Sequence, residues 1–76
     1  MDTLDVTKIL VLVRKAAVKG YTDTAYGYLH SDFQPKLDLF TKDIHKRIIG
    51  GTMAANLAVI KAYDFGRQAY LEKIAV

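Results

Sequence analysis

Apolar side chains recur at helical spacing over most of the chain, and the longest such segment is C-terminal. Residues 52–76 follow Gly50-Gly51, contain no proline and are apolar over a wide arc when placed at about 100° per residue. We predict a helix over this range, with the hydroxyl of Thr52 as its N-cap. A helix that is apolar over so wide an arc is usually buried on more than one side, so we expect it to be central to the fold.

The two apolar faces of this predicted helix differ in the size of their side chains. The first is a ridge of small residues at successive i+4 positions, with close neighbours along it: Ala54, Ala58, Ala62 and Gly66, with Ala55, Phe65 and Ala69. Such a ridge lets another backbone approach closely, although Gly66 could instead mark a kink or hinge. The second face carries Met53, Val59, Ile60, Tyr63, Tyr70, Leu71 and Ile74. A small domain offers few neighbours for so wide an apolar surface, so we expect part of that surface to meet a second chain.

A second helical pattern occupies the N-terminal region. Residues 6–19 place lysines on one side (Lys8, Lys15, Lys19) and apolar side chains on the other (Val6, Ile9, Leu12, Val13, Ala16, Ala17). Candidate N-terminal caps are Asp2, Thr3 and Asp5. Gly20 stands where a helix C′ residue belongs. The run 9–13 could instead form a buried strand, because β-branched residues favour sheets, but the helical pattern fits the longer window.

The middle of the chain predicts a short helix, a break and a long amphipathic helix. Residues 21–30 form the weaker segment, since Gly27 interrupts it. The break at residues 31–35 leads into a helix whose first turn tolerates Pro35. The apolar face of that helix comprises Phe33, Leu37, Phe40, Ile44 and Ile48, and the predicted i,i+4 ion pairs are Asp38–Lys42 and Asp43–Arg47. Gly50-Gly51 ends it and allows a reversal into the last helix.

These elements predict an all-α fold. We expect a compact bundle of three main helices plus one short helix, with the long C-terminal helix at its centre. Residues 1–76 contain no linker or repeat, so a single domain is predicted.

Composition limits the setting in which such a bundle would act. Cysteine is absent, which leaves no disulfide framework and fits a reducing, cytoplasmic location. The acidic start, MDTLD, is unlike a signal peptide. The longest apolar run, 9–13, is far shorter than the roughly 20 residues that span a bilayer, so no membrane association is expected. The formal net charge of +3 is mild for a nucleic-acid binder.

Residues able to carry out catalysis or bind a metal are sparse. Ser31 lies between His30 and Asp32, but side chains on adjacent residues of a turn point in different directions and do not form a catalytic triad. The second histidine, His45, lies among basic residues that disfavour a bound cation. We therefore expect a protein that is not an enzyme, with no cofactor and no metal ion.

A basic cluster supports an alternative function. It consists of Lys42, His45, Lys46 and Arg47 on the predicted third helix. A helix, a short helix and a basic helix in succession are compatible with a helix-turn-helix reader of nucleic acid. Asp38 and Asp43 lie near the same surface and would repel phosphate, so this reading is the alternative.

The leading hypothesis is a protein-binding module. Apolar and amphipathic aromatic side chains that exceed the needs of a small core are typical of contact surfaces. The predicted contact residues are Leu39, Tyr63, Tyr70, Leu71 and Ile74. A free-standing chain this short is predicted to act as an adaptor, regulator or inhibitor of a larger protein, and to self-associate as a homo-oligomer.

Overall fold

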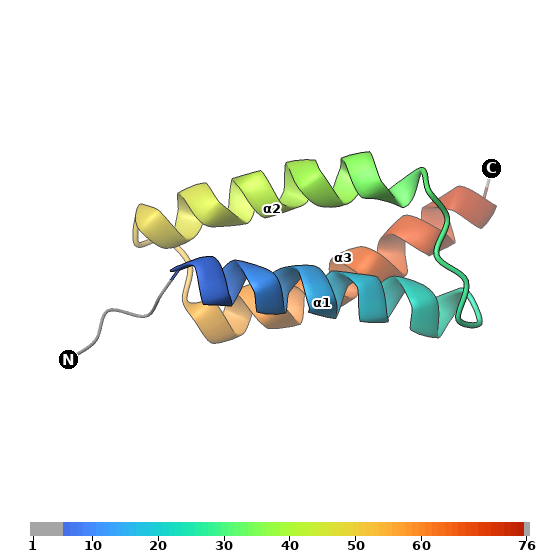
Figure 1. Ribbon diagram of the computed structural model, residues 1–76, viewed down its shortest axis with the longest axis horizontal. Helices are drawn as coiled ribbons and strands as arrows, with labels where there is room; N and C mark the ends of the chain where they lie inside the picture. Colours follow the sequence, from blue (N-terminus) through green and yellow to red (C-terminus); the bar gives the residue numbers. More distant parts are fainter. Residues whose placement is uncertain (1–5, 76) are drawn as a thin grey trace.

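Three amphipathic segments form the helices of the computed structural model, which describes residues 6–75. They are α1 (Val6–Thr24), α2 (Phe33–Ile49) and α3 (Ala55–Ile74). The chain runs up, down and up along a rod of 44 × 19 × 18 Å (Figure 1). The predicted all-α bundle is confirmed, and the strand alternative for residues 9–13 is wrong because they lie within α1. The candidate caps Asp2, Thr3 and Asp5, and the predicted helix end at Val76, lie outside the described residues.

The first helix does not end at Gly20, and the predicted short helix is absent from the described chain. Residues 21–24 continue α1, which therefore includes much of that segment. Tyr26 and Gly27 then adopt positive φ angles of 57° and 86°, which turn the chain out of the helix. Left-handed conformations at two successive residues cannot continue a right-handed helix. The helical path therefore ends before Tyr26, the first residue with a positive φ angle.

Gly20 has a packing role instead. It is buried, and a Cβ atom at this position would meet the backbone carbonyl of Tyr63 in α3. Gly66 in α3 faces α1 in the same way, because its Cβ would meet the carbonyl of Ala17 and come within 2.7 Å of the Tyr21 amide nitrogen. One glycine on each helix thus lets the backbones of α1 and α3 approach closely. The prediction of close packing at Gly66 is confirmed.

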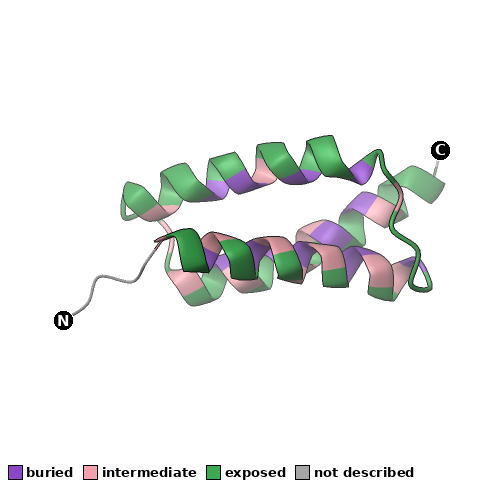
Figure 2. Ribbon diagram, in the orientation of Figure 1, coloured by how far each residue is buried: buried purple, intermediate pink, exposed green. Residues whose placement is uncertain are grey.

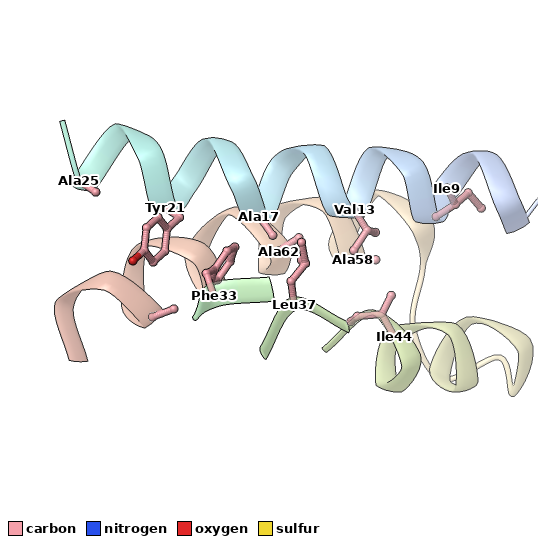
Figure 3. Packing of buried hydrophobic residues seen from close by; sticks show 11 residues of the cluster. Ile9, Val13, Ala17, Tyr21, Ala25, Phe33, Leu37, Ile44, Ala58 and Ala62 are labelled. Carbon is pink, nitrogen blue, oxygen red and sulfur yellow. The ribbon is translucent and has the colours of Figure 1, made fainter. Parts of the chain in front are cut away.

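The core follows from this close pair. The small-residue ridge of α3 is buried at Ala58, Ala62, Gly66 and Ala69. Val13 and Ala17 of α1 lie against Ala58 and Ala62 (Figure 3). Leu12, which the periodicity placed on the buried face of α1, is 54% exposed, because α1 is covered along a narrower arc than the sequence pattern suggested.

The second helix closes the core from one side. It buries Phe33, Leu37 and Ile44, and Phe40 stacks on Phe65 of α3 with ring centroids 4.1 Å apart. Its predicted apolar face is confirmed. Of the two predicted ion pairs, Asp43–Arg47 forms at 2.8 Å. Asp38 instead pairs with Arg14 of α1 at 3.0 Å, because α1 brings a guanidinium within its reach.

The last helix starts later than predicted. It begins at Ala55 with Ala54 as N-cap, so Ala54 is exposed outside the ridge. The hydroxyl of Thr52 donates to the carbonyl oxygen of Arg47 at 3.2 Å and therefore helps to close α2 rather than to cap α3. Gly51, with a φ of 77°, makes the reversal between the two helices.

Candidate protein-binding surface

The outer face of α3 carries the large aliphatic side chains that the core leaves out. By this name we mean the side opposite the buried ridge, with Leu57, Ile60, Asp64, Arg67, Leu71 and Ile74. The exposed fractions are 43% for Leu57, 64% for Ile60, 36% for Leu71 and 57% for Ile74. The last turns of α3 are exposed on nearly every side (Figure 2). On α3, alanine and glycine therefore face the core of the bundle, while leucine and isoleucine face away from it.

A groove between α2 and α3 extends this face. It is lined by Phe40, Leu57, Ile60, Lys61, Asp64 and Phe65. Its floor is aromatic, since Phe40 and Phe65 stack there, and its rim carries one positive and one negative side chain. Three of the lining residues, Leu57, Ile60 and Asp64, belong to the outer face of α3, so the face and the groove form one continuous surface.

The predicted contact residues divide into three groups. Leu71 and Ile74 lie on the outer face of α3. Tyr63 and Tyr70 are half-buried on its flank and also hold the fold together. Leu39 is 69% exposed but lies on α2, so it does not belong to the outer face of α3.

Each tyrosine of the flank is tied to another element. The Tyr63 hydroxyl donates to Asp23 Oδ2 of α1 at 2.7 Å. The Tyr70 ring meets the Tyr21 ring edge-on, with centroids 5.5 Å apart. These contacts fix where the flank of α3 lies relative to α1. They also mean that substitutions at the two tyrosines would disturb the fold as well as any binding.

The hydrogen bond from Tyr63, supported by Lys19, lowers the pKa of Asp23 below its ordinary value of 3.8. The folded chain therefore binds this proton less readily than the unfolded chain. The stabilisation is fully present above the ordinary pKa and is lost as the pH falls through the folded value. Because Tyr63 is the largest cause, Tyr63→Phe should reduce the loss of stability between about pH 5 and about pH 2.

This expectation can be checked by urea unfolding, followed by circular dichroism at a series of pH values. Tyr26→Phe is the matched control, since Tyr26 is 95% exposed. The control should keep the acid dependence of the parent protein. An equal acid dependence in Tyr63→Phe and the parent protein would show that the Tyr63–Asp23 contact does not form in solution.

The side chains of His30 and Asp32, the neighbours of Ser31, are held by partners from other parts of the chain. His30 Nδ1 and the Tyr21 hydroxyl share a hydrogen bond of 2.7 Å. Lys73 donates to Asp32 at 2.6 Å, which lowers the pKa of Asp32 and raises that of Lys73. The adjoining cavity measures about 10 Å³, roughly the space that one water molecule needs. This region joins the end of α3 to the start of α2 through the Lys73–Asp32 ion pair.

The basic residues of α2 spread over more than one surface. Lys42 and His45 line a groove against α1 together with Leu10, Arg14, Asp38 and Thr41. Arg47 Nε donates to Asp43 Oδ2 at 2.8 Å, so part of its charge is neutralised. Lys46 is exposed near the C-terminal end of α2.

The helix-turn-helix alternative requires a short helix before α2. Residues 25–32 instead form an irregular connection, and α1 and α2 run side by side in opposite directions (Figure 1). Nucleic-acid contact through Lys42, His45, Lys46 and Arg47 stays a prediction that this arrangement does not favour.

Between residues 6 and 75, no three histidine or acidic side chains gather where they could hold a metal ion. No helix in the same range is long and apolar enough to cross a membrane. Comparison with family models, with curated proteins and with solved structures finds no match to this chain.

The predicted contact residues include two of the six residues of the outer face, Leu71 and Ile74. Ile60 was placed on the large-residue face but not among the contact residues. Leu57, Asp64 and Arg67 were missed altogether, because a charged pair interrupts the apolar pattern and Leu57 stood outside the large-residue face. The signal that could have found them is the alternation of three- and four-residue steps from Leu57 to Ile74.

Proposed function

We propose that this protein is a non-enzymatic binding module, an adaptor, regulator or inhibitor that docks through the outer face of α3. The observation that carries the proposal is the inverted distribution of side chains on that helix. Leu57, Ile60, Leu71 and Ile74 are exposed by 36% to 64%, while alanine and glycine fill the core side.

The fold gives no reason for these aliphatic side chains. The contact between α1 and α3 depends on small residues and on backbone approach, so polar residues on the outer face would leave it intact. Four large aliphatic side chains on one exposed helix face form a patch of the kind that marks a protein-binding site. Complete burial of one exposed leucine or isoleucine is worth about 1.5–3 kcal/mol, and these side chains are 36% to 64% exposed, so a docked partner would recover roughly half of that amount from each.

The groove between α2 and α3 supports the same proposal. Its aromatic floor, formed by Phe40 and Phe65, can receive an apolar side chain from a partner that lies along α3. Lys61 and Asp64 at the rim can orient that partner through polar contacts. Apolar centres with charged rims are the usual composition of protein interfaces.

A photo-crosslinking residue at position 60 tests the proposal in the cells that express the protein. We expect irradiation to give a cross-linked protein product of discrete mass. The matched control places the same residue at Lys15, on the exposed side of α1, where no product is expected. Absence of any product at positions 57, 60 and 71 alike would overturn the proposed function.

A further inference from the structure

The exposed positions of α3 follow a heptad pattern. Leu57, Ile60, Asp64, Arg67, Leu71 and Ile74 succeed one another at steps of 3, 4, 3, 4 and 3 residues. This is the a/d spacing with which one helix packs along another in a coiled coil. The buried ridge occupies the opposite side of α3, so the whole pattern faces away from α1.

The six positions are also symmetric about one point of the helix. Leu57 and Ile74 are equally far from the midpoint between Phe65 and Gly66, and the same is true of Ile60 and Leu71. Asp64 and Arg67 form the innermost pair about that midpoint. Aliphatic positions therefore match aliphatic positions, and an acid matches a base.

This symmetry decides between the two ways in which a second α3 could pack. In an antiparallel pair with a two-fold axis at the midpoint, each residue meets its mate from the other copy. Leu57 meets Ile74, Ile60 meets Leu71, and two Asp64–Arg67 ion pairs form across the axis. A parallel pair would instead set Asp64 against Asp64 and Arg67 against Arg67, and such like-charge contacts are strongly unfavourable.

We propose that the occupant of the outer face of α3 is a second copy of this chain, packed antiparallel through α3 about a two-fold axis between Phe65 and Gly66. This inference rests on the proposed function of the outer face as a binding surface and names its partner. A two-fold interface is self-complementary, and the symmetric order of these six positions provides that complementarity.

The six positions would form the seam between the two copies, and the side chains on either side of this seam are compatible with the antiparallel register. Tyr63 comes beside Tyr70 of the second copy on one flank, and Lys61 comes beside Gln68 on the other. Neither contact opposes like charges. The two predicted contact tyrosines thus border the interface, which agrees with their half-buried state in the single chain.

The central ion pairs set orientation more than affinity. Within one chain, Asp64 and Arg67 already approach to 3.7 Å, and their side chains are 65% and 46% exposed. Both can therefore turn toward a second copy. A buried ion pair loses hydration and often contributes little net stability, whereas a polar layer in an apolar seam fixes register and direction. The outer four layers, which are aliphatic, supply the attraction.

A seam of this length can hold because the helix is already folded. The six positions span roughly 26 Å at about 1.5 Å per residue. Isolated helices of this length are marginal in water, and their ordering would oppose association. Packing of α3 against α1 removes most of that cost before the two copies meet.

Charge reversal tests the proposal by sedimentation equilibrium. The parent protein should be a dimer. Asp64→Arg alone, and Arg67→Asp alone, should each raise the dissociation constant by about 100-fold or more, since each places two like-charge contacts at the axis. The double variant Asp64→Arg/Arg67→Asp should regain the dimer. An equimolar mixture of the two single variants should form a mixed dimer, because their charges are then complementary.

A matched control separates this effect from loss of an intrahelical pair. Asp43→Arg breaks the Asp43–Arg47 bridge on α2 and changes the charge by the same amount, away from the seam. It should remain dimeric. Circular dichroism on all variants should show an unchanged helix content, because Asp64 and Arg67 are exposed in the single chain.

Spin labels report the direction of packing. The chain has no cysteine, so Asn56→Cys accepts a label at one place. Labels on the two copies should be separated by about 28 Å along the axis in the antiparallel pair, and should lie side by side in a parallel one. A short distance overturns the proposed arrangement.

Failure of this inference is distinct from failure of the proposed function. A parent protein that stays monomeric at millimolar concentration, or single variants that dimerise as well as the parent, overturns the two-fold pair. The crosslink at position 60 would then contain a different protein, and the outer face would still be a binding surface.

Discussion

Replacement of Gly66 by alanine should strongly destabilise the protein, although alanine is the better helix former. In the middle of a helix, alanine is favoured over glycine by about 1 kcal/mol. Here the added methyl group would meet the carbonyl of Ala17 and lie 2.7 Å from the Tyr21 amide nitrogen. Both are backbone atoms, which cannot move aside by changing a rotamer. The helices must separate, and this loosens the contacts of Ala58 and Ala62 with α1.

We expect the free energy of unfolding to fall by about 2 kcal/mol or more, since overpacking of a tight core costs about 1–3 kcal/mol and the atoms met here belong to the backbone. Urea unfolding followed by circular dichroism measures the change as a lower midpoint. Gly20→Ala should behave alike, because its added Cβ would meet the backbone of Tyr63.

Gly50→Ala serves as the control for these glycine variants. Gly50 has a φ of −75°, and its Cβ would lie 3.2 Å from the Lys46 carbonyl oxygen, a contact that a small shift relieves. The Gly50→Ala substitution should change the free energy of unfolding by no more than about 0.5 kcal/mol. If Gly66→Ala proved as stable as the parent protein, the close approach of α1 and α3 would be wrong.

The second large effect is expected at Tyr21, which joins all three helices. Its side chain is 1% exposed. Its ring stacks on Phe33 of α2 with centroids 4.5 Å apart and meets Tyr70 of α3 edge-on at 5.5 Å. Tyr21→Ala should lower the free energy of unfolding by about 3–5 kcal/mol, the range for loss of a buried aromatic ring. A domain of this size has little stability beyond that amount.

Tyr21→Phe separates the ring from its hydroxyl group. The phenylalanine keeps the stacking and removes the hydrogen bond with His30, so we expect a loss of about 1 kcal/mol. Thermal and urea unfolding measure both variants, and the phenylalanine variant remains informative if the alanine variant does not fold. Equal losses in the two variants would show that the hydroxyl, rather than the ring, holds this end of the bundle.

The sequence predicted correctly those features that depend on residues close together in the chain. Pro35 in a first turn, an apolar face from Phe33 to Ile48 and the Gly50-Gly51 reversal describe α2 correctly, because each acts within a few residues of its position. The buried ridge at Ala58, Ala62 and Gly66 was also predictable, since small residues at i+4 spacing have few other uses in a helix.

Where a signal depended on a distant partner, the prediction was wrong. Gly20 has the same appearance in the sequence whether it ends a helix or admits another backbone, and only the position of Tyr63 in α3 distinguishes the two. The same applies to Asp38, which has Lys42 four residues away but pairs with Arg14. A contact partner 24 residues away leaves no local pattern.

The sequence by itself determined that this protein is helical, that its last helix is apolar on two sides, and that one of those sides is made of small residues. It also contains the symmetric order of positions 57 to 74. Only the tertiary structure decided which side faces the core, because helix periodicity defines faces but not their neighbours. Burial of the alanine and glycine side by α1 left the leucines and isoleucines exposed, and that exposure is the basis of the binding surface that we propose.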